Sequence, residues 1–169
     1  MREQPPLIRD ATEADLASIF AIYNTEIERG VSTFETAPKD PVRDRPWLTG
    51  REARYPVLVA TDPGGDEVLG WGSLTRWSPK AGYDRTAEVS VYVDPGARKR
   101  GVGSALLQAL IARAPRSDIA VLIARVTDAN PASLALHASV GFEPIGTQRR
   151  SGEKFGRILD VVLMDLHLD

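Results

Sequence analysis

Cysteine is absent from the 169-residue chain, and histidine occurs only twice. Without cysteine there can be no disulfide bonds, no zinc sites built on thiolates and no cysteine nucleophile, and we expect no bound metal. No apolar run approaches the roughly 20 residues that a membrane-spanning helix needs. The first ten residues, MREQPPLIRD, lack the apolar core of a signal peptide, so we expect a cytoplasmic protein without a membrane partner.

A strong net charge is also missing, because 21 Lys and Arg residues stand against 23 Asp and Glu residues. A chain without a global basic field is not expected to bind nucleic acid. Its hydrophobic content of 43% and charged content of 26% are typical of a folded globular protein. Its length suits one hydrophobic core, so we expect a single domain over residues 1–169.

The stretch from Thr86 to Leu107 places a strand, a glycine-bearing loop and a helix in succession. Valines alternate along residues 89–93, and a helical pattern begins after the loop Arg98–Ser104, with glycines at 101 and 103. The first N–H groups of a helix have no intrahelical partner, and glycine lets a phosphate approach the backbone. The stretch therefore indicates an anion site, although an ordinary turn with solvated Arg and Lys side chains is an alternative.

The pattern R-x-x-G-x-G, carried by Arg98, Gly101 and Gly103 after a strand that holds Glu88, resembles the acetyl-coenzyme A signature of the GNAT N-acetyltransferase superfamily. Four further segments narrow the resemblance to the branch of phosphinothricin and methionine sulfone or sulfoximine acetyltransferases. They are TAEVSVYV at 86–93, NPASLALH at 130–137, Gly141-Phe142 and KFGRILD at 154–160. The resemblance extends from Ile8 to Leu168.

Hydrophobic periodicity predicts the element order β-α-α-β-β-β-α-β-α-β-β. This order indicates a mixed α/β domain with a central, mostly antiparallel sheet of six or seven strands and about four helices. It agrees with the GNAT fold, in which the strand of Glu88 and the strand after Pro115 splay apart around the cofactor. The resemblance also implies a bulge within Val89–Val93, and we interpret Arg149–Arg157 as a polar turn between the last two strands.

Acetyl transfer to an amine needs a neutral amine, a held thioester, donors for the developing oxyanion and a proton for the leaving thiolate. Glu88 is the natural base, although a structural carboxylate paired with Arg85 or another cation is the alternative. Many GNAT enzymes have a tyrosine acid where this chain has His137, which is therefore a candidate thiol contact or a structural residue. We expect Tyr92 to pack on the face of the sheet opposite Glu88.

The resemblance implies acetyl-coenzyme A as cosubstrate. The residues expected to bind it are Val91, Val93, Arg98, Lys99, Arg100, Gly101, Val102, Gly103, Ser104, Asn130 and Ser133. Asn130 is also a good helix cap, and both roles can coexist.

The acceptor implied by the resemblance is a small amino-acid-like amine, whose carboxylate an arginine would bind. Its expected contacts are Phe34, Glu35, Arg76, Trp77, Tyr83 and Arg85. Related enzymes tend to have an arginine where this chain has Ser78, so phosphinothricin, methionine sulfoximine, methionine sulfone and other small amines stay open. The resemblance also implies a homodimer.

Three other functions are compatible with parts of the pattern. The chain could bind acyl-coenzyme A without catalysis, as a sensor, or it could acetylate another amine or a protein N-terminus. A dinucleotide-binding domain is disfavoured, because Leu106 stands where a third glycine would be needed and the regular βαβαβ alternation is missing.

Overall fold

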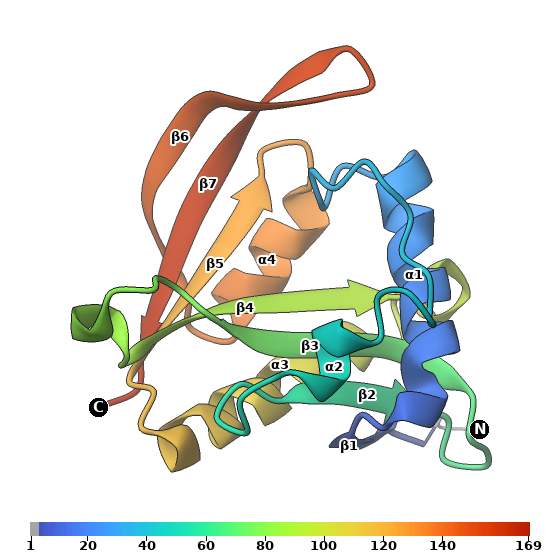
Figure 1. Ribbon diagram of the computed structural model, residues 1–169. Helices are drawn as coiled ribbons and strands as arrows, with labels where there is room; N and C mark the ends of the chain where they lie inside the picture. The colour runs from blue at the N-terminus through green and yellow to red at the C-terminus, as the bar shows by residue number, and fades with distance from the viewer. Residues whose placement is uncertain (1–3) are drawn as a thin grey trace.

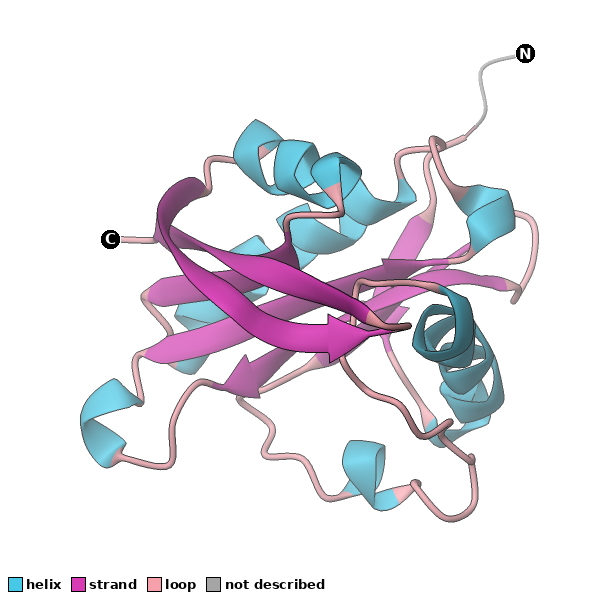
Figure 2. Ribbon diagram, turned by 90° about the horizontal axis from the view of Figure 1, so that it is seen from above, coloured by secondary structure: helices cyan, strands magenta, loops and turns pink. Residues whose placement is uncertain are grey.

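The computed structural model describes residues 4–169, which build one sheet with helices on both of its sides (Figure 1, Figure 2). The strands are β1 (Leu7–Asp10), β2 (Val57–Thr61), β3 (Val68–Arg76), β4 (Thr86–Val93), β5 (Val121–Thr127), β6 (Glu143–Lys154) and β7 (Arg157–His167). The α-helices are α1 (Leu16–Arg29), α2 (Pro46–Thr49), α3 (Val102–Arg113) and α4 (Pro131–Ser139). The expected mixed α/β fold with a mostly antiparallel sheet is confirmed.

The strand order is β1-β2-β3-β4-β5-β7-β6, and β4 runs parallel to β5 while the other neighbours are antiparallel. On one face, Ile19 and Phe20 of α1 pack against Trp71 of β3. On the other face, Leu106 and Leu110 of α3 are fully buried against the central strands. The sheet therefore separates two apolar clusters, as the helical spacing of these side chains requires. None of the helices in residues 4–169 is long and apolar enough to cross a membrane.

Strands β4 and β5 pair over three residues and then separate. The last pair joins Glu88 to Ile123. Beyond it, β4 stays paired with β3 as far as Val93, and β5 stays paired with β7 as far as Thr127. The two strands therefore diverge within one sheet, as Figure 1 shows, and the expected splay is confirmed.

Three local expectations are wrong. The pairing of β3 with β4 keeps one register from Ala87 to Val93, so the expected bulge is missing from this ladder. Tyr92 lies on the same face as Glu88, since side chains of a strand repeat every two residues, and its ring contacts Tyr23 of α1. The segment expected as a long polar turn is mostly strand, because left-handed Phe155 and its glycine neighbour close the hairpin within two residues.

The β6–β7 hairpin extends past the end of β5 and curls toward the loop that follows α1 (Figure 1). Near its tip, the side chain of Lys154 is buried, although β6 is otherwise largely exposed. Its Nζ donates to the carbonyl oxygens of Glu26, at 2.9 Å, and Thr33, at 2.8 Å. Burial lowers the pKa of Lys154. The ammonium thus binds one carbonyl in the last turn of α1 and one in the loop that follows, and it joins the hairpin to both.

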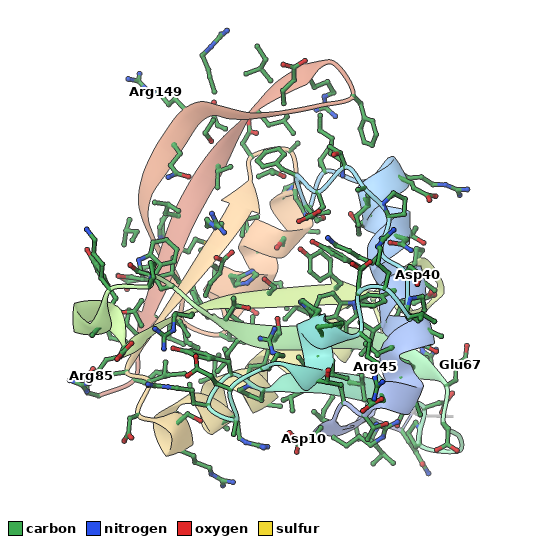
Figure 3. All side chains as sticks on the ribbon, in the orientation of Figure 1. Asp10, Asp40, Arg45, Glu67, Arg85 and Arg149 are labelled. Carbon is green, nitrogen blue, oxygen red and sulfur yellow. The ribbon has the colours of Figure 1, made fainter. Side chains whose placement is uncertain are left out.

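We expect Lys154→Met to keep the packing of the side-chain stem and to lose both hydrogen bonds. Each hydrogen bond to a charged group contributes about 1.5–3 kcal/mol, so the free energy of unfolding should fall by at least about 1.5 kcal/mol in urea titrations. Hydrogen exchange of amides 30–34 should accelerate. Arg149→Met on the outer surface of the same strand (Figure 3) is the control, and an equal loss in both variants would contradict this role for Lys154.

Candidate functional site

A cavity of about 620 Å³ opens where β4 and β5 diverge. It is bordered by the loop after α1, by the end of β4, by the N-terminus of α3, by the end of β5 and by α4. The lining residues are Glu26, Gly30–Ser32, Val89–Val93, Ala97–Lys99, Gly101–Ser104, Arg125–Thr127, Ala129, Asn130, Ala132, Ser133, Leu136 and His137.

The N-terminus of α3 is open toward this cavity. Gly101 has the left-handed φ of 78°, which glycine adopts without strain, and its position provides no side-chain cap. A Cβ at Gly103 would lie 3.1 Å from Leu136 and 3.5 Å from Val93, two residues that line the cavity. The first N–H groups of α3 therefore face a space that a side chain would narrow. By contrast, the N-terminus of α4 is capped by Asn130, whose side chain accepts from the Ser133 amide.

The backbone of β4 offers hydrogen-bonding groups to the gap. The amide of Asp94 donates to the carbonyl of Leu69 in β3, so even-numbered residues direct their polar groups toward β3. Alternation then turns the N–H and C=O groups of Val91 and Val93 toward β5, which has already diverged. An extended ligand in the gap would meet these groups as a neighbouring strand would.

The loop after α1 is fastened along one wall of the cavity. Thr127 donates its hydroxyl to the Val31 carbonyl at 3.1 Å, and Asn130 donates its side-chain amide to the Ser32 hydroxyl at 3.0 Å. The ring of Phe34 packs so closely on the hairpin that a Cβ at Gly152 would lie 2.1 Å from it. Strand β5, helix α4 and the β6–β7 hairpin therefore hold the loop together.

His137 lines the cavity from α4 and is 5% exposed. Its Nδ1 lies 2.8 Å from the Ser133 carbonyl oxygen, which can only accept, so Nδ1 carries a proton. Burial lowers the pKa of His137, and the ring is therefore neutral at pH 7 with a lone pair on Nε2. In this state Nε2 accepts a hydrogen bond, which suits a thiol contact better than the role of an acid.

Glu88 is paired with an arginine that sequence reasoning missed. Arg125 of β5 donates its Nε to Oε1 of Glu88 at 2.9 Å and its Nη2 to Oε2 at 2.7 Å. The guanidinium also lies 5.9 Å from the ring centre of Trp77. A charged residue inside the apolar segment IAVLIARV was the available signal for Arg125. The paired carboxylate weighed in the sequence analysis is therefore present, with Arg125 as partner instead of Arg85.

The residues expected to contact the acceptor lie outside the cavity lining. Arg76 is 3.3 Å from Glu52 and 3.8 Å from Asp84, while Arg85 points into solvent near the C-terminus, 3.7 Å from Asp169 (Figure 3). The others are Phe34, which packs on the hairpin; Glu35, which pairs with Lys39; exposed Tyr83; and Trp77, which lies beside Arg125. Arg85 and Glu88 are three positions apart, and this odd spacing directs strand side chains to opposite faces.

The residues expected to bind the cofactor line the cavity with one exception. Arg100 turns toward Asp62, at 4.0 Å. The other ten are Val91, Val93, Arg98, Lys99, Gly101, Val102, Gly103, Ser104, Asn130 and Ser133. Arg98 makes a 2.6 Å ion pair with Glu26 of α1 at the edge of the cavity. The loop and the helix start thus form one continuous surface with the end of β4.

Comparison with known proteins gives consistent similarities. Residues 17–142 match the model of the acetyltransferase (GNAT) family. The chain is 43% identical over 163 residues to an L-methionine sulfoximine/L-methionine sulfone acetyltransferase of Pseudomonas paraeruginosa, covering 96% of this chain and 94% of the relative.

Two solved structures are similar over nearly the whole chain. One is a GNAT superfamily phosphinothricin acetyltransferase from Sinorhizobium meliloti in complex with AcCoA, with a TM-score of 0.90, 35% identity and coverage of 98% of this chain and 89% of that one. The other is a ribosomal-protein-alanine N-acetyltransferase from Brucella melitensis, with a TM-score of 0.91, 42% identity and coverage of 96% and 99%.

The lowered pKa of His137 predicts a pH dependence of stability. In the unfolded chain this histidine takes up a proton near pH 6.5, whereas in the folded protein its lowered pKa shifts protonation to a lower pH. The stability that comes from keeping this ring neutral is therefore complete above pH 6.5 and is lost progressively as the pH falls from 6.5 through the lower pKa of the folded state. We expect His137→Gln to flatten the decline in unfolding free energy that sets in below about pH 6.5. Exposed His167→Gln is the control, and an unchanged decline in His137→Gln would show that burial of this ring is not its source.

Proposed function

The chain belongs to the acetyltransferase (GNAT) family, and we propose that it acetylates the amino group of a small amino acid. The acceptor is of the methionine sulfoximine, methionine sulfone or phosphinothricin type, the types named for its relatives. The protein is an acetyl-coenzyme A-dependent N-acetyltransferase. The observation that carries the proposal is the cavity that begins at the uncapped N-terminus of α3 and continues into the gap between β4 and β5.

The residues of this cavity fit acetyl-coenzyme A, which supplies the acetyl group as a thioester when it is bound. The amides at the start of α3 suit the pyrophosphate, and the glycines at 101 and 103 leave room for it. Lys99 adds positive charge at the same end of the cavity. The backbone of Val91 and Val93 suits the extended arm, which would take the place of a paired strand.

Glu88 is the base in this proposal. An α-amino group titrates near about pH 8, so most acceptor molecules carry an ammonium at neutral pH and must lose a proton before attack. The carboxylate of Glu88 accepts this proton, directly or through one water. The neutral nitrogen then forms a bond to the acetyl carbon, and the bond from that carbon to sulfur breaks. The nitrogen loses its second proton to become the amide, and the leaving thiolate takes up a proton, directly or through water, and departs as the thiol.

A protein N-terminus is the second candidate acceptor, favoured by the similarity to the Brucella melitensis N-acetyltransferase. The two acceptors are separated by mass spectrometry of products formed from acetyl-coenzyme A with L-methionine sulfone or with an alanine-initiated peptide. Acetylation of the peptide alone would contradict the amino-acid proposal. Turnover of neither would favour a catalytically inactive sensor of acyl-coenzyme A. A homodimer and a cytoplasmic location stay predictions.

If the helix start binds the pyrophosphate, Gly103→Val should weaken acetyl-coenzyme A binding at least about tenfold, because the new side chain narrows the approach to the backbone. The apo fold should survive, because the nearest atom to a Cβ here is the end of the Leu136 side chain. Calorimetry on the folded variant measures the affinity. Gly146→Val, in open space on β6, is the matched control. Equal affinities in the two variants would rule out this phosphate site.

Glu88→Gln keeps the shape of the side chain but cannot accept the proton. We expect kcat with L-methionine sulfone to fall by about 10²-fold or more at neutral pH. Part of the loss should be recovered at high pH, where the amine loses its proton without help. A steady-state pH profile tests this expectation. Wild-type turnover in the variant at every pH would mean that Glu88 has only a structural role.

A further inference from the structure

The pair of Glu88 and Arg125 joins the two strands at the point where they diverge. Glu88 belongs to the last residue pair between β4 and β5, and Arg125 lies two residues beyond its partner Ile123. The two hydrogen bonds at 2.9 Å and 2.7 Å have the parallel geometry of a bidentate guanidinium–carboxylate contact. The pairing of β4 with β5 therefore positions this ion pair at the point where the gap between the strands begins.

The two members of this pair differ in their access to the cavity. The side chain of Arg125 is 51% exposed and lines the cavity, whereas that of Glu88 is 19% exposed and is not among the lining residues. A molecule that enters the cavity meets the guanidinium before it meets the carboxylate. As long as Arg125 holds both oxygens of Glu88, the ammonium of an acceptor must compete with the guanidinium for them.

Arg125 is also the cation best placed for an acceptor. Of the Lys and Arg side chains that line the cavity within residues 4–169, Arg98 and Lys99 lie at the α3 end, and Arg98 is paired with Glu26. Ser78 brings no charge to the segment beside Trp77. The bonds to Glu88 use two donors of the guanidinium, which carries five N–H groups. Donors therefore remain for a second carboxylate.

We propose that Arg125 binds the carboxylate of the amino-acid acceptor and, by taking up this contact, releases Glu88 to receive the proton of the acceptor's ammonium. The inference rests on the proposed function, since it presumes an amino-acid acceptor. An α-amino acid carries its ammonium and carboxylate on one carbon, and these charges complement Glu88 and Arg125 respectively. An amine without a carboxylate leaves the bonds between Arg125 and Glu88 intact. The ion pair therefore favours an acceptor that carries both an ammonium and a carboxylate.

The proposal predicts how the enzyme discriminates between L-methionine sulfone and its carboxyl amide. Arg125→Ala should raise KM for the acid by about 10- to 150-fold, the effect of losing hydrogen bonds to a charged group. KM for the amide should change little, so the preference for the acid disappears. Arg125→Lys keeps the charge but not the bidentate geometry and should retain part of the preference. KM for acetyl-coenzyme A should stay at the wild-type value in both variants.

Glu88→Gln gives the signature that a merely structural ion pair would not give. The amide of glutamine holds the guanidinium less strongly than a carboxylate does, so Arg125 becomes more available to the acceptor. The ratio of KM for the amide to KM for the acid should therefore rise in Glu88→Gln, while it falls in Arg125→Ala. Loss of the attraction between Glu88 and the ammonium affects the acid and the amide alike and cancels in this ratio.

Arg113→Ala is the matched control, because Arg113 also makes a two-bond contact with a carboxylate, that of Asp10, at 2.9 Å and 3.4 Å outside the cavity. It should keep the wild-type ratio. Steady-state kinetics on each variant, with circular dichroism as the test of folding, supply all the readouts. If Arg125→Ala does not fold, the partial loss of preference in Arg125→Lys decides the question.

The outcomes separate this inference from the proposed function. Wild-type preference for the acid that persists in both Arg125 variants would overturn the role of Arg125 and leave the amino-acid acetyltransferase intact. A wild-type enzyme that acetylates acid and amide equally would also overturn it, with N-acetyltransferase activity still standing. Failure of the wild type to acetylate either molecule would defeat the proposed function itself, and the inference with it.

Discussion

The site depends on the loss of hydrogen bonding between β4 and β5 beyond Glu88 and Ile123. A parallel pair that continued to the strand ends would satisfy the backbone groups of Val91 and Val93 and would close the sheet. Instead, β3 and β7 hold the two strands on their outer sides, so each strand remains ordered while the space between them stays open. Unpaired backbone groups are costly when they are buried, which is why such a gap suits a ligand with strand-like hydrogen bonding.

The wall of the cavity is preorganised by contacts from distant parts of the chain. Thr127 and Asn130 hold residues 31 and 32 from one side, and Lys154 binds the carbonyl of Thr33 from the other. Phe34 completes the attachment by packing on Gly152. A loop fixed in this way loses little conformational freedom when a ligand binds, and this saving favours affinity.

Each end of the cavity has an ion pair. Arg98 pairs with Glu26 near the start of α3, and Arg125 pairs with Glu88 at the divergence of the strands. Partly buried charges are stabilised by such pairing, and a charged ligand must exchange partners with them as it binds. In the proposed mechanism, binding of the acceptor and transfer of its proton are therefore coupled electrostatically at the Glu88 end.

The amino-acid sequence by itself determined the local features of this protein. Residues 86–107 predicted the strand, the glycine loop and the start of α3 correctly, because neighbouring residues fix the backbone there: left-handed Gly101 needs no distant contact. The alternation of β-branched residues likewise predicted most strands, and apolar residues at helical spacing predicted most helices. The prediction of an anion site followed from the same stretch, since a helix start and its glycines are adjacent in the chain.

Tertiary structure alone decided which charges meet at the site. Glu88 and Arg125 are 37 residues apart in the chain, and only the parallel pairing of β4 with β5 brings them together. Arg85 is near Glu88 in sequence, but three residues of extended strand span roughly 10 Å and reverse the direction of the side chain. Lys154 and Glu26 are 128 residues apart in the chain, and the β6–β7 hairpin brings the ammonium to the Glu26 carbonyl. Long-range strand pairing, which sequence patterns leave open, selected the partners of the ionisable groups.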